Sequence, residues 1–271
     1  MKDVKILTIT PEIACEMLEQ NSDNRTISQA TVDAYARDLK NGDFKFNGDS
    51  IRMREDGILA DGQHRLWACV QTGIPFQSVL FTGLTKEDVK TIDRNKVRSS
   101  GDVLRISRGY KNGDNLASAI RFVGHFATGE RNIRLTDHEI IHFIDNCPEI
   151  EESNKICGMS FARAGALKTR SGVFVAIHFI GWKVFGEKDM ADDFMRVLQT
   201  GVPIYENDAA HKLRDVLLKD NMSTKKLRVE AKTAYVAAAW RKFQSATPVK
   251  VLRPLFPYRI KEIPFKDFIK G

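Results

Sequence analysis

The chain has 271 residues, of which 42% are hydrophobic and 28% charged, so it can bury one large core or two modest ones. Its longest apolar run, over residues 173–180, is far too short to span a bilayer, and no stretch resembles a signal peptide. The four cysteines show no paired spacing, which argues against a zinc ribbon and a disulfide framework. We therefore expect a cytoplasmic protein with reduced thiols and no membrane partner.

The net charge of +7 is distributed unevenly along the chain. Residues 1–105 hold 15 Lys and Arg against 16 Asp and Glu, whereas residues 106–271 hold 27 against 19. The last 61 residues alone hold 15 against 5. Basic charge gathered at one end is typical of a protein with a polyanionic partner, usually nucleic acid. A solvated basic surface without a partner is the alternative.

The first third of the chain alternates strand and helix signals, which predicts a small mixed α/β domain over residues 1–105. The expected order is a strand over 4–9, helices over 11–18 and 28–41, a hairpin of 51–54 with 58–60, a helix over 63–72, a strand over 75–82 and a short helix over 85–92. The turn of the hairpin is expected at Asp56-Gly57.

Strand signals nearly vanish after Ser99, which predicts an all-α, basic domain over residues 106–271 and an α+β fold for the whole chain. Residues 173–185 are apolar on all sides and are expected to form the central helix of that domain. An extended piece over 249–255 precedes a proline-containing tail. Helices are predicted over 99–107, 113–128, 136–146, 148–157, 170–185, 188–200, 207–219 and 223–245.

A strand-to-helix corner crowds Asp61, Gln63, His64 and Arg65 around Gly62. Gly62 has no Cβ, so the backbone can approach a ligand closely there. The first N–H groups of the helix and the positive end of its dipole point into the same space, which suits an anion, above all a phosphate. The alternative is that Asp61 is only the N-cap of a structural helix, although capping would not require the His-Arg pair.

The residues of this corner carry a resemblance to a known superfamily. The run Ile51-Arg-Met-Arg, Gly57-Ile-Leu-Ala-Asp-Gly-Gln-His-Arg-Leu-Trp-Ala and Gly73-Ile-Pro resembles the nucleotide-binding core of the ParB/sulfiredoxin superfamily. Asn21-x-x-Asn24-Arg25 upstream and Thr91-Ile-Asp-Arg-Asn95 with Arg98 downstream match as well, so the resemblance covers residues 3–105. The Asp-Gly-Gln-His-Arg spelling is similar to that of free-serine kinases in the superfamily and of DGQHR-type proteins linked to DNA modification. The whole layout resembles ParB-domain proteins of phages and mobile elements.

The resemblance implies a nucleotide, ATP or CTP, bound with Mg²⁺ in a bacterial or phage-infected cell. It also allows a homodimer, since dimers are common among ParB relatives. Asp61 would hold Mg²⁺ or act as a base, unless it is only a cap, and Arg65 would neutralise phosphate charge. The nucleotide-binding residues implied by the resemblance are Asn24, Arg25, Gly62, Gln63, His64, Arg65, Asp93, Asn95 and Arg98.

The resemblance leaves several activities open, because the superfamily includes CTP switches, ATP-dependent reductases, kinases and nucleases. The leading expectation is nucleotide hydrolysis or phosphoryl transfer, with Asp61, His64 and Arg65 as the catalytic residues. The alternatives are a DNA-binding or partner-binding regulator without turnover and a metal-dependent nuclease using Asp61, His64 and Asp93. A thiol reductase is disfavoured, since Gln63 occupies the neighbourhood of the reductase's cysteine and Cys69 lies farther along the helix.

Residues 138–142, His-Glu-Ile-Ile-His, fit the zincin pattern H-E-x-x-H on a helix. Thr136 and Glu139, however, also form the pattern of a capping box, which would give Glu139 a local role. No glycine or third histidine follows at the expected spacing, so a zinc metalloprotease is the least favoured hypothesis, and tightly bound zinc would revive it. A third ligand would have to come from Glu149, Glu151, Glu152 or His178.

The basic residues near the end of the chain are expected to lie on one long helix over 223–245 and to contact the DNA backbone without sequence specificity. Tyr235, Trp240 and Phe243 alternate with them, but aromatic residues at this spacing are more typical of a core than of a stacking platform. The predicted contacts are Lys225, Lys226, Arg228, Lys232, Arg241 and Lys242.

Overall fold

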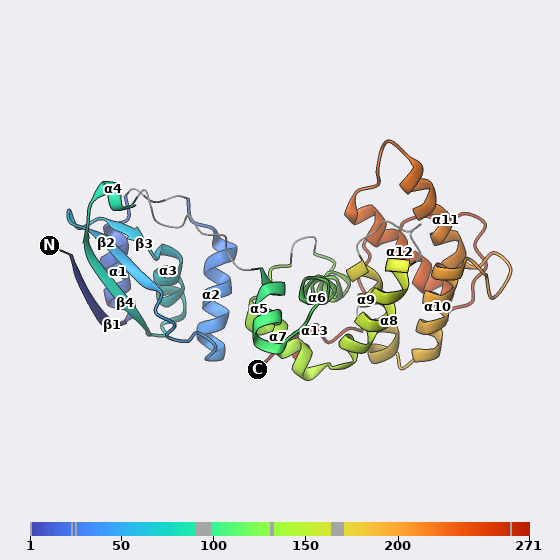
Figure 1. The fold of residues 1–271 in the computed structure, drawn as a ribbon, viewed down its shortest axis with the longest axis horizontal. Coiled ribbons are helices and arrows are strands. Elements are labelled where there is room, and N and C mark those ends of the chain that lie inside the picture. Colours follow the sequence, from blue (N-terminus) through green and yellow to red (C-terminus); the bar gives the residue numbers. More distant parts are fainter. Residues whose placement is uncertain are drawn as a thin grey trace. The chain divides into compact units, whose positions relative to one another are not determined.

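The computed structural model describes residues 2–22, 24, 26–89, 99–130, 133–163, 171–260 and 262–271. The chain has a mixed α+β fold and divides into two compact units, Met1–Val97 and Arg98–Lys270 (Figure 1). Within the described ranges, no helix is long and apolar enough to cross a membrane.

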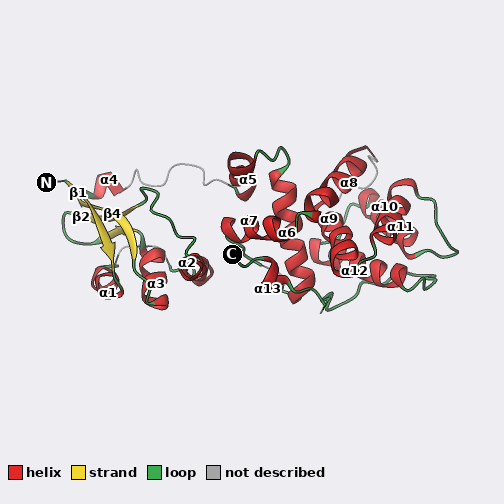
Figure 2. Cartoon of the chain, turned by 90° about the horizontal axis from the view of Figure 1, so that it is seen from below, coloured by secondary structure: helices red, strands yellow, loops and turns green. Residues whose placement is uncertain are grey.

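The first unit is a four-stranded mixed sheet with helices on one face (Figure 2). The strand order is β1-β4-β2-β3, in which β2 and β4 are parallel and the other two pairs are antiparallel. The elements are β1 (Asp3–Ile9), α1 (Pro11–Glu19), α2 (Gln29–Asn41), β2 (Ser50–Arg54), β3 (Leu59–Asp61), α3 (Gln63–Thr72), β4 (Phe76–Leu84) and α4 (Lys86–Val89).

The strand register explains why α1, α2 and α3 cover that face. Ile51 pairs with Leu80, and Ile9 pairs with Phe76, so all four side chains lie on the same side of the sheet. Leu66 of α3 packs against them and is fully buried. Burial of this apolar face provides the main stabilisation of the unit and fixes the position of α3.

The predicted elements of the first unit are largely confirmed. The helix predicted over 28–41 ends at Gly42, which has the expected positive φ of 74°. The hairpin joins β2 to β3, with an irregularity in register between Arg52 and Met53. Of the short helix predicted over 85–92, α4 covers Lys86–Val89, and the remaining residues lie outside the described ranges.

The secondary-structure elements in the described part of the second unit are all helices. Its central element is α9, as predicted from the apolar sequence of residues 173–185. Phe174 and Ile177 of this helix are fully buried. Helices from before and after it in the chain, including α6, α8, α10 and α12, pack around it. The elements are α5 (Ser100–Arg108), α6 (Gly113–Thr128), α7 (Asp137–Asn146), α8 (Glu149–Arg163), α9 (Ser171–Phe179), the π-helix η1 (Ile180–Val184), α10 (Lys188–Thr200), α11 (Ala209–Met222), α12 (Val229–Gln244) and α13 (Phe265–Phe268).

The helix predicted over 223–245 begins six residues later than expected, so this part of the prediction is wrong. The backbone N–H of Leu227 donates a hydrogen bond to Asp220 Oδ1 at 2.5 Å, which folds residues 223–228 back onto the end of α11. Arg228 has extended backbone angles and is the N-cap of α12. A buried acidic side chain outside the segment therefore overrides the local helical preference.

Candidate functional site

The corner at residues 61–65 has the predicted strand-to-helix geometry. Asp61 ends β3, and α3 begins at Gln63. Gly62 is the N-cap with φ of 105°, so Asp61 is not the cap of this helix and that alternative is wrong. A Cβ at Gly62 would lie 2.3 Å from Ile51 Cδ1, which makes glycine necessary for packing as well as for backbone conformation.

Arg65 is a buried cation at the first turn of α3, with only 9% of its side chain exposed. Its Nη2 donates to the Ser50 carbonyl oxygen at 2.8 Å and lies 3.7 Å from Asp61 Oδ2. Its Nη1 is buried and has no hydrogen-bond partner among the described residues. A buried donor left unpaired costs free energy, so this guanidinium is suited to an acceptor that arrives with a ligand.

Asp61 lies between two guanidinium groups, because Arg52 Nη1 is also 3.7 Å from Asp61 Oδ2. The group of Arg52, Asp61 and Arg65 thus carries a net charge of +1. Arg52 was not among the predicted site residues, yet the hairpin turn at Asp56-Gly57 indicates it, since a register centred there pairs residue 52 with residue 61. The observed pairing is the same.

Asn24 and Gln63, both predicted site residues, are brought together through Asn21. The Asn24 amide donates to Asn21 Oδ1 and to the Leu59 carbonyl oxygen, each at 2.6 Å. The Asn21 amide in turn donates to Gln63 Oε1 at 3.1 Å. These bonds hold the loop after α1 against the start of α3, so the two predicted residues form one wall of the corner.

His64 connects the corner to α2. The backbone N–H of Ser28 donates to His64 Nε2 at 3.1 Å, which places the proton of the neutral imidazole on Nδ1. The hydrogen bond fixes the ring orientation and the approach of α2, so His64 positions an element in addition to any role toward a ligand. Four further predicted site residues lie outside the described ranges: Arg25, Asp93, Asn95 and Arg98.

Tyr35 is a second residue that was not among the predicted site residues. Helix α2 places it within electrostatic range of Arg65 and Asp61. Burial raises the pKa of Tyr35, and the neighbouring Arg65 opposes that rise in part. Its ring packs edge-on against Phe44 with centroids 6.1 Å apart. Tyr35 therefore brings a partly buried phenol from α2 within electrostatic range of the corner.

The H-E-x-x-H segment uses its glutamate for helix capping. Glu139 is buried, its Oε2 accepts from the Thr136 backbone N–H at 2.7 Å, and Thr136 Oγ1 accepts from Glu139 N, as the capping-box pattern predicted. Among the residues that the structure describes, no group of three His, Cys, Asp or Glu is arranged to hold a metal ion. This helix end is therefore accounted for by local structure.

Ser153, His178 and Asp192 form a hydrogen-bonded series that resembles a nucleophile triad. Ser153 Oγ lies 2.9 Å from His178 Nδ1, and His178 Nε2 lies 2.9 Å from Asp192 Oδ1. Ser153 and His178 are both fully buried, and both ring nitrogens of His178 already have partners within the series, so no group in it is left for a ligand. The series joins α8, α9 and α10 and has a structural role.

Burial lowers the pKa of His178, although its hydrogen bond to Asp192 opposes the shift. The folded protein therefore resists protonation of this ring, while the unfolded chain takes up a proton near the ordinary value of 6.5. We expect the free energy of unfolding to fall as the pH is lowered below that value. Denaturant unfolding between pH 7 and pH 5 measures the slope, and His178→Gln, which cannot titrate, should flatten it. An equal slope in both proteins would contradict the assignment.

The predicted basic patch is divided by the structure. Lys226 Nζ donates to the carbonyl oxygens of Asp220 and Asn221, and Lys232 Nζ lies 2.7 Å from Asp220 Oδ2. Lys232 and Arg241 are separated by nine positions, which at about 100° per residue places them on opposite sides of α12. Lys225, Lys226 and Arg228 precede α12, so the prediction that all six cations share one helix is wrong.

The comparisons with known proteins identify no relative: the chain matches no protein-family model, no curated protein and no solved structure. A proposal about the function therefore depends on the fold and on the corner at residues 61–65.

Proposed function

We propose that the protein binds a nucleoside triphosphate, ATP or CTP with Mg²⁺, at the corner of the first unit and acts in association with nucleic acid. One observation carries the nucleotide part: Arg65, buried at the first turn of α3, has an Nη1 donor without a partner. The resemblance of residues 3–105 to the ParB/sulfiredoxin superfamily supports the same reading. The basic charge of the second unit supports a polyanionic partner.

The electrostatics of the corner favour a phosphate over other ligands. The positive end of the α3 dipole, Arg52 and Arg65 face a single carboxylate, Asp61. A phosphate oxygen accepting from Arg65 would satisfy the buried donor with a charge-assisted hydrogen bond. Asp61 would then be released toward Mg²⁺, whose preferred ligands are carboxylate and phosphate oxygens.

Turnover at this site would be phosphoryl transfer or hydrolysis. An acceptor oxygen, from a hydroxyl or from water, would bond to the terminal phosphorus while the bond to the leaving diphosphate breaks. Asp61 is the described carboxylate at the corner that could take the acceptor proton. The second candidate is a nucleotide-dependent regulator without turnover. The hydrogen bonds that Gln63 and His64 accept from the protein's own loops favour this candidate, because they position those loops around the corner.

Nucleotide-dependent stabilisation tests the proposal. We expect one of ATP, CTP, GTP and UTP, added with Mg²⁺, to stabilise the wild-type protein by about 2.7 kcal/mol at a concentration one hundred times its Kd. Arg65→Ala should lose this stabilisation because it removes the buried donor. Thermal-shift curves for the four nucleotides, with and without Mg²⁺, give the measurement.

Arg54→Ala is the matched control for that experiment. Arg54 is as deeply buried as Arg65, at 7% against 8% exposure, but its guanidinium pairs with Asp56 in the hairpin turn. The Arg54→Ala variant should have a lower melting temperature than the wild type and keep the nucleotide-dependent shift. Equal shifts in the wild type and Arg65→Ala, or no shift with any nucleotide, would overturn the proposal. Product formation then separates an enzyme from a regulator.

A further inference from the structure

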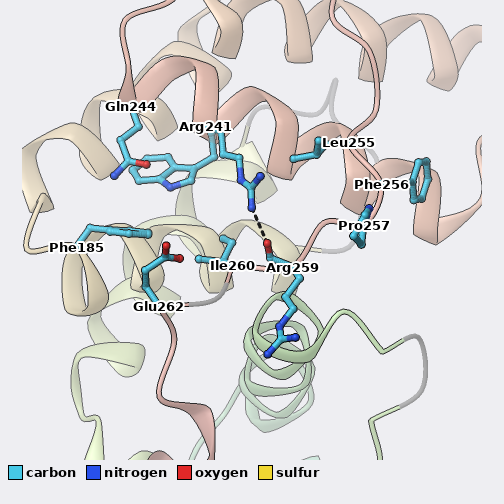
Figure 3. Close-up of a pocket in the computed structure, with 10 residues that line it drawn as sticks. Phe185, Arg241, Gln244, Leu255, Phe256, Pro257, Arg259, Ile260 and Glu262 are labelled. Carbon is cyan, nitrogen blue, oxygen red and sulfur yellow. Dashed lines mark hydrogen bonds between the residues drawn. The ribbon is translucent and has the colours of Figure 1, made fainter.

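A pocket of about 650 Å³ lies in the second unit, between the C-terminal half of α12 and the returning segment 249–260. Figure 3 shows Phe185 and Glu262 on one side of this pocket and Leu255, Phe256 and Pro257 on the other. The returning segment is held in place by buried side chains and by the hydrogen bond from Leu255 N to the Ala234 carbonyl oxygen at 3.2 Å. The pocket is large enough for a heteroaromatic ring with its substituents.

Trp240 lines the pocket and contributes an unsatisfied donor. Its Nε1 is buried and has no hydrogen-bond partner within the described part of the chain. The indole cannot easily turn away, because Phe194 packs perpendicular to it at 5.4 Å and a Cβ at Gly181 would lie 2.6 Å from its Cη2. A buried indole N–H normally finds an acceptor, so a ligand that brings one would be stabilised here.

Two acceptors face the same pocket. Gln244 Nε2 donates to Glu187 Oε2 at 2.8 Å, which leaves the amide oxygen of Gln244 as an acceptor. Glu262 is exposed and has neither a hydrogen bond nor an ion pair with any described residue. A donor and two acceptors beside Phe185 match the edge of a nucleobase, which presents both kinds of group around an aromatic ring.

A second pocket of about 540 Å³ adjoins the first, with Arg241 and Leu255 shared between them. It adds the exposed cations Lys242 and Arg253 to a lining that is otherwise mostly apolar. Arg241, which lines both pockets, donates one hydrogen bond to the Arg259 carbonyl oxygen at 2.5 Å, and this bond holds its guanidinium in place (Figure 3). Three cations beside the first pocket, Arg241, Lys242 and Arg253, suit a phosphate backbone that runs past a captured base.

We infer that the two pockets together bind single-stranded nucleic acid, with one base in the pocket at Trp240 and the neighbouring phosphates along Arg241, Lys242 and Arg253. Phe256, 56% exposed at the rim, provides a face on which the next base stacks. A duplex keeps its bases paired and stacked, so it cannot fill the first pocket. The inference rests on the proposed association with nucleic acid and specifies both its location and its strand state.

Fluorescence anisotropy with labelled 12-nucleotide DNA and RNA single strands, and with a DNA duplex of the same sequence, tests the inference on the full chain. We expect a single strand to bind at least about tenfold more tightly than the duplex at low salt. Phe256→Ala, which removes the stacking face, should weaken single-strand binding at least about fivefold. Trp240→Phe, which removes the indole donor, should weaken it to the same extent at least. Lys242→Ala and Arg253→Ala should each reduce the magnitude of the salt slope by about 1.

Lys219→Ala and Lys266→Ala are the matched controls, because both lysines are exposed cations of the same unit that line neither pocket. Phe256→Ala removes an exposed side chain, so its effect is separable from unfolding, and melting curves check Trp240→Phe. Preference for the duplex, or equal losses in the control and pocket variants, would overturn this inference alone. Absence of binding to any of the three nucleic acids would overturn the proposed association as well.

Discussion

Gly62→Ala should lower the free energy of unfolding of the first unit by about 3 to 5 kcal/mol. This is the largest loss that we expect from adding one methyl group at the corner. Two costs add at this position. The backbone has φ of 105°, a conformation that a residue with a Cβ rarely adopts. The new Cβ would also lie 2.3 Å from Ile51 Cδ1, so the fully buried Ile51 side chain would have to change its rotamer in a packed core or β2 would have to shift. Hydrogen exchange of peptides from β2 and α3 measures the loss within this unit.

Gly57→Ala separates the two costs. Gly57 has φ of 83° in the hairpin turn, but nothing lies within 4 Å of the Cβ that alanine would add there. Only the backbone strain remains, so we expect a loss of about 1 to 2 kcal/mol. If both variants lose the same stability, the contact with Ile51 is not a constraint and the corner has room for a side chain.

The sequence was informative about the corner because the determinants of its geometry are local. A short apolar strand, Gly62 and a helix ended by Gly73 follow one another within residues 59–73, and each acts on its immediate neighbours. The same locality would have revealed Arg52 through the hairpin register. Local patterns likewise identified the capping box at Thr136 and Glu139.

The pocket at Trp240 could not be predicted in this way, because contacts between distant residues create it. Residues 249–260 carry no periodic pattern, and their course is set by hydrogen bonds to partners far away in the sequence, such as the one from Ile260 N to the Phe126 carbonyl oxygen at 2.5 Å. Of the three aromatic residues of α12 that were predicted to belong to a core, Trp240 is fully buried, Phe243 is nearly so, and Tyr235 is partly buried against the core. That a core tryptophan would also line a pocket required the tertiary structure.

Asp220→Ala should destabilise the second unit by about 2 to 4 kcal/mol, because it removes a buried carboxylate that satisfies a partly buried ammonium and a backbone N–H. Lys232 Nζ lies 2.7 Å from Asp220 Oδ2, and these side chains are 17% and 2% exposed. The Leu227 backbone N–H, which donates a hydrogen bond to Asp220 Oδ1, would also lose its acceptor. Denaturant unfolding followed by circular dichroism, which reports mainly on this helical unit, measures the loss.

Asp215→Ala is the control on the same helix, since the Asp215 side chain is 43% exposed and pairs only loosely with His211 at 3.8 Å. Its effect should stay within about 0.5 kcal/mol. A similarly small effect of Asp220→Ala would mean that residues 223–228 are free to continue the helix, so the predicted basic helix could form. A large effect restricted to Asp220 would mean that Lys232 serves the fold, because its charge is neutralised internally. The cations that line the two pockets, Arg241, Lys242 and Arg253, would then carry the contact with nucleic acid.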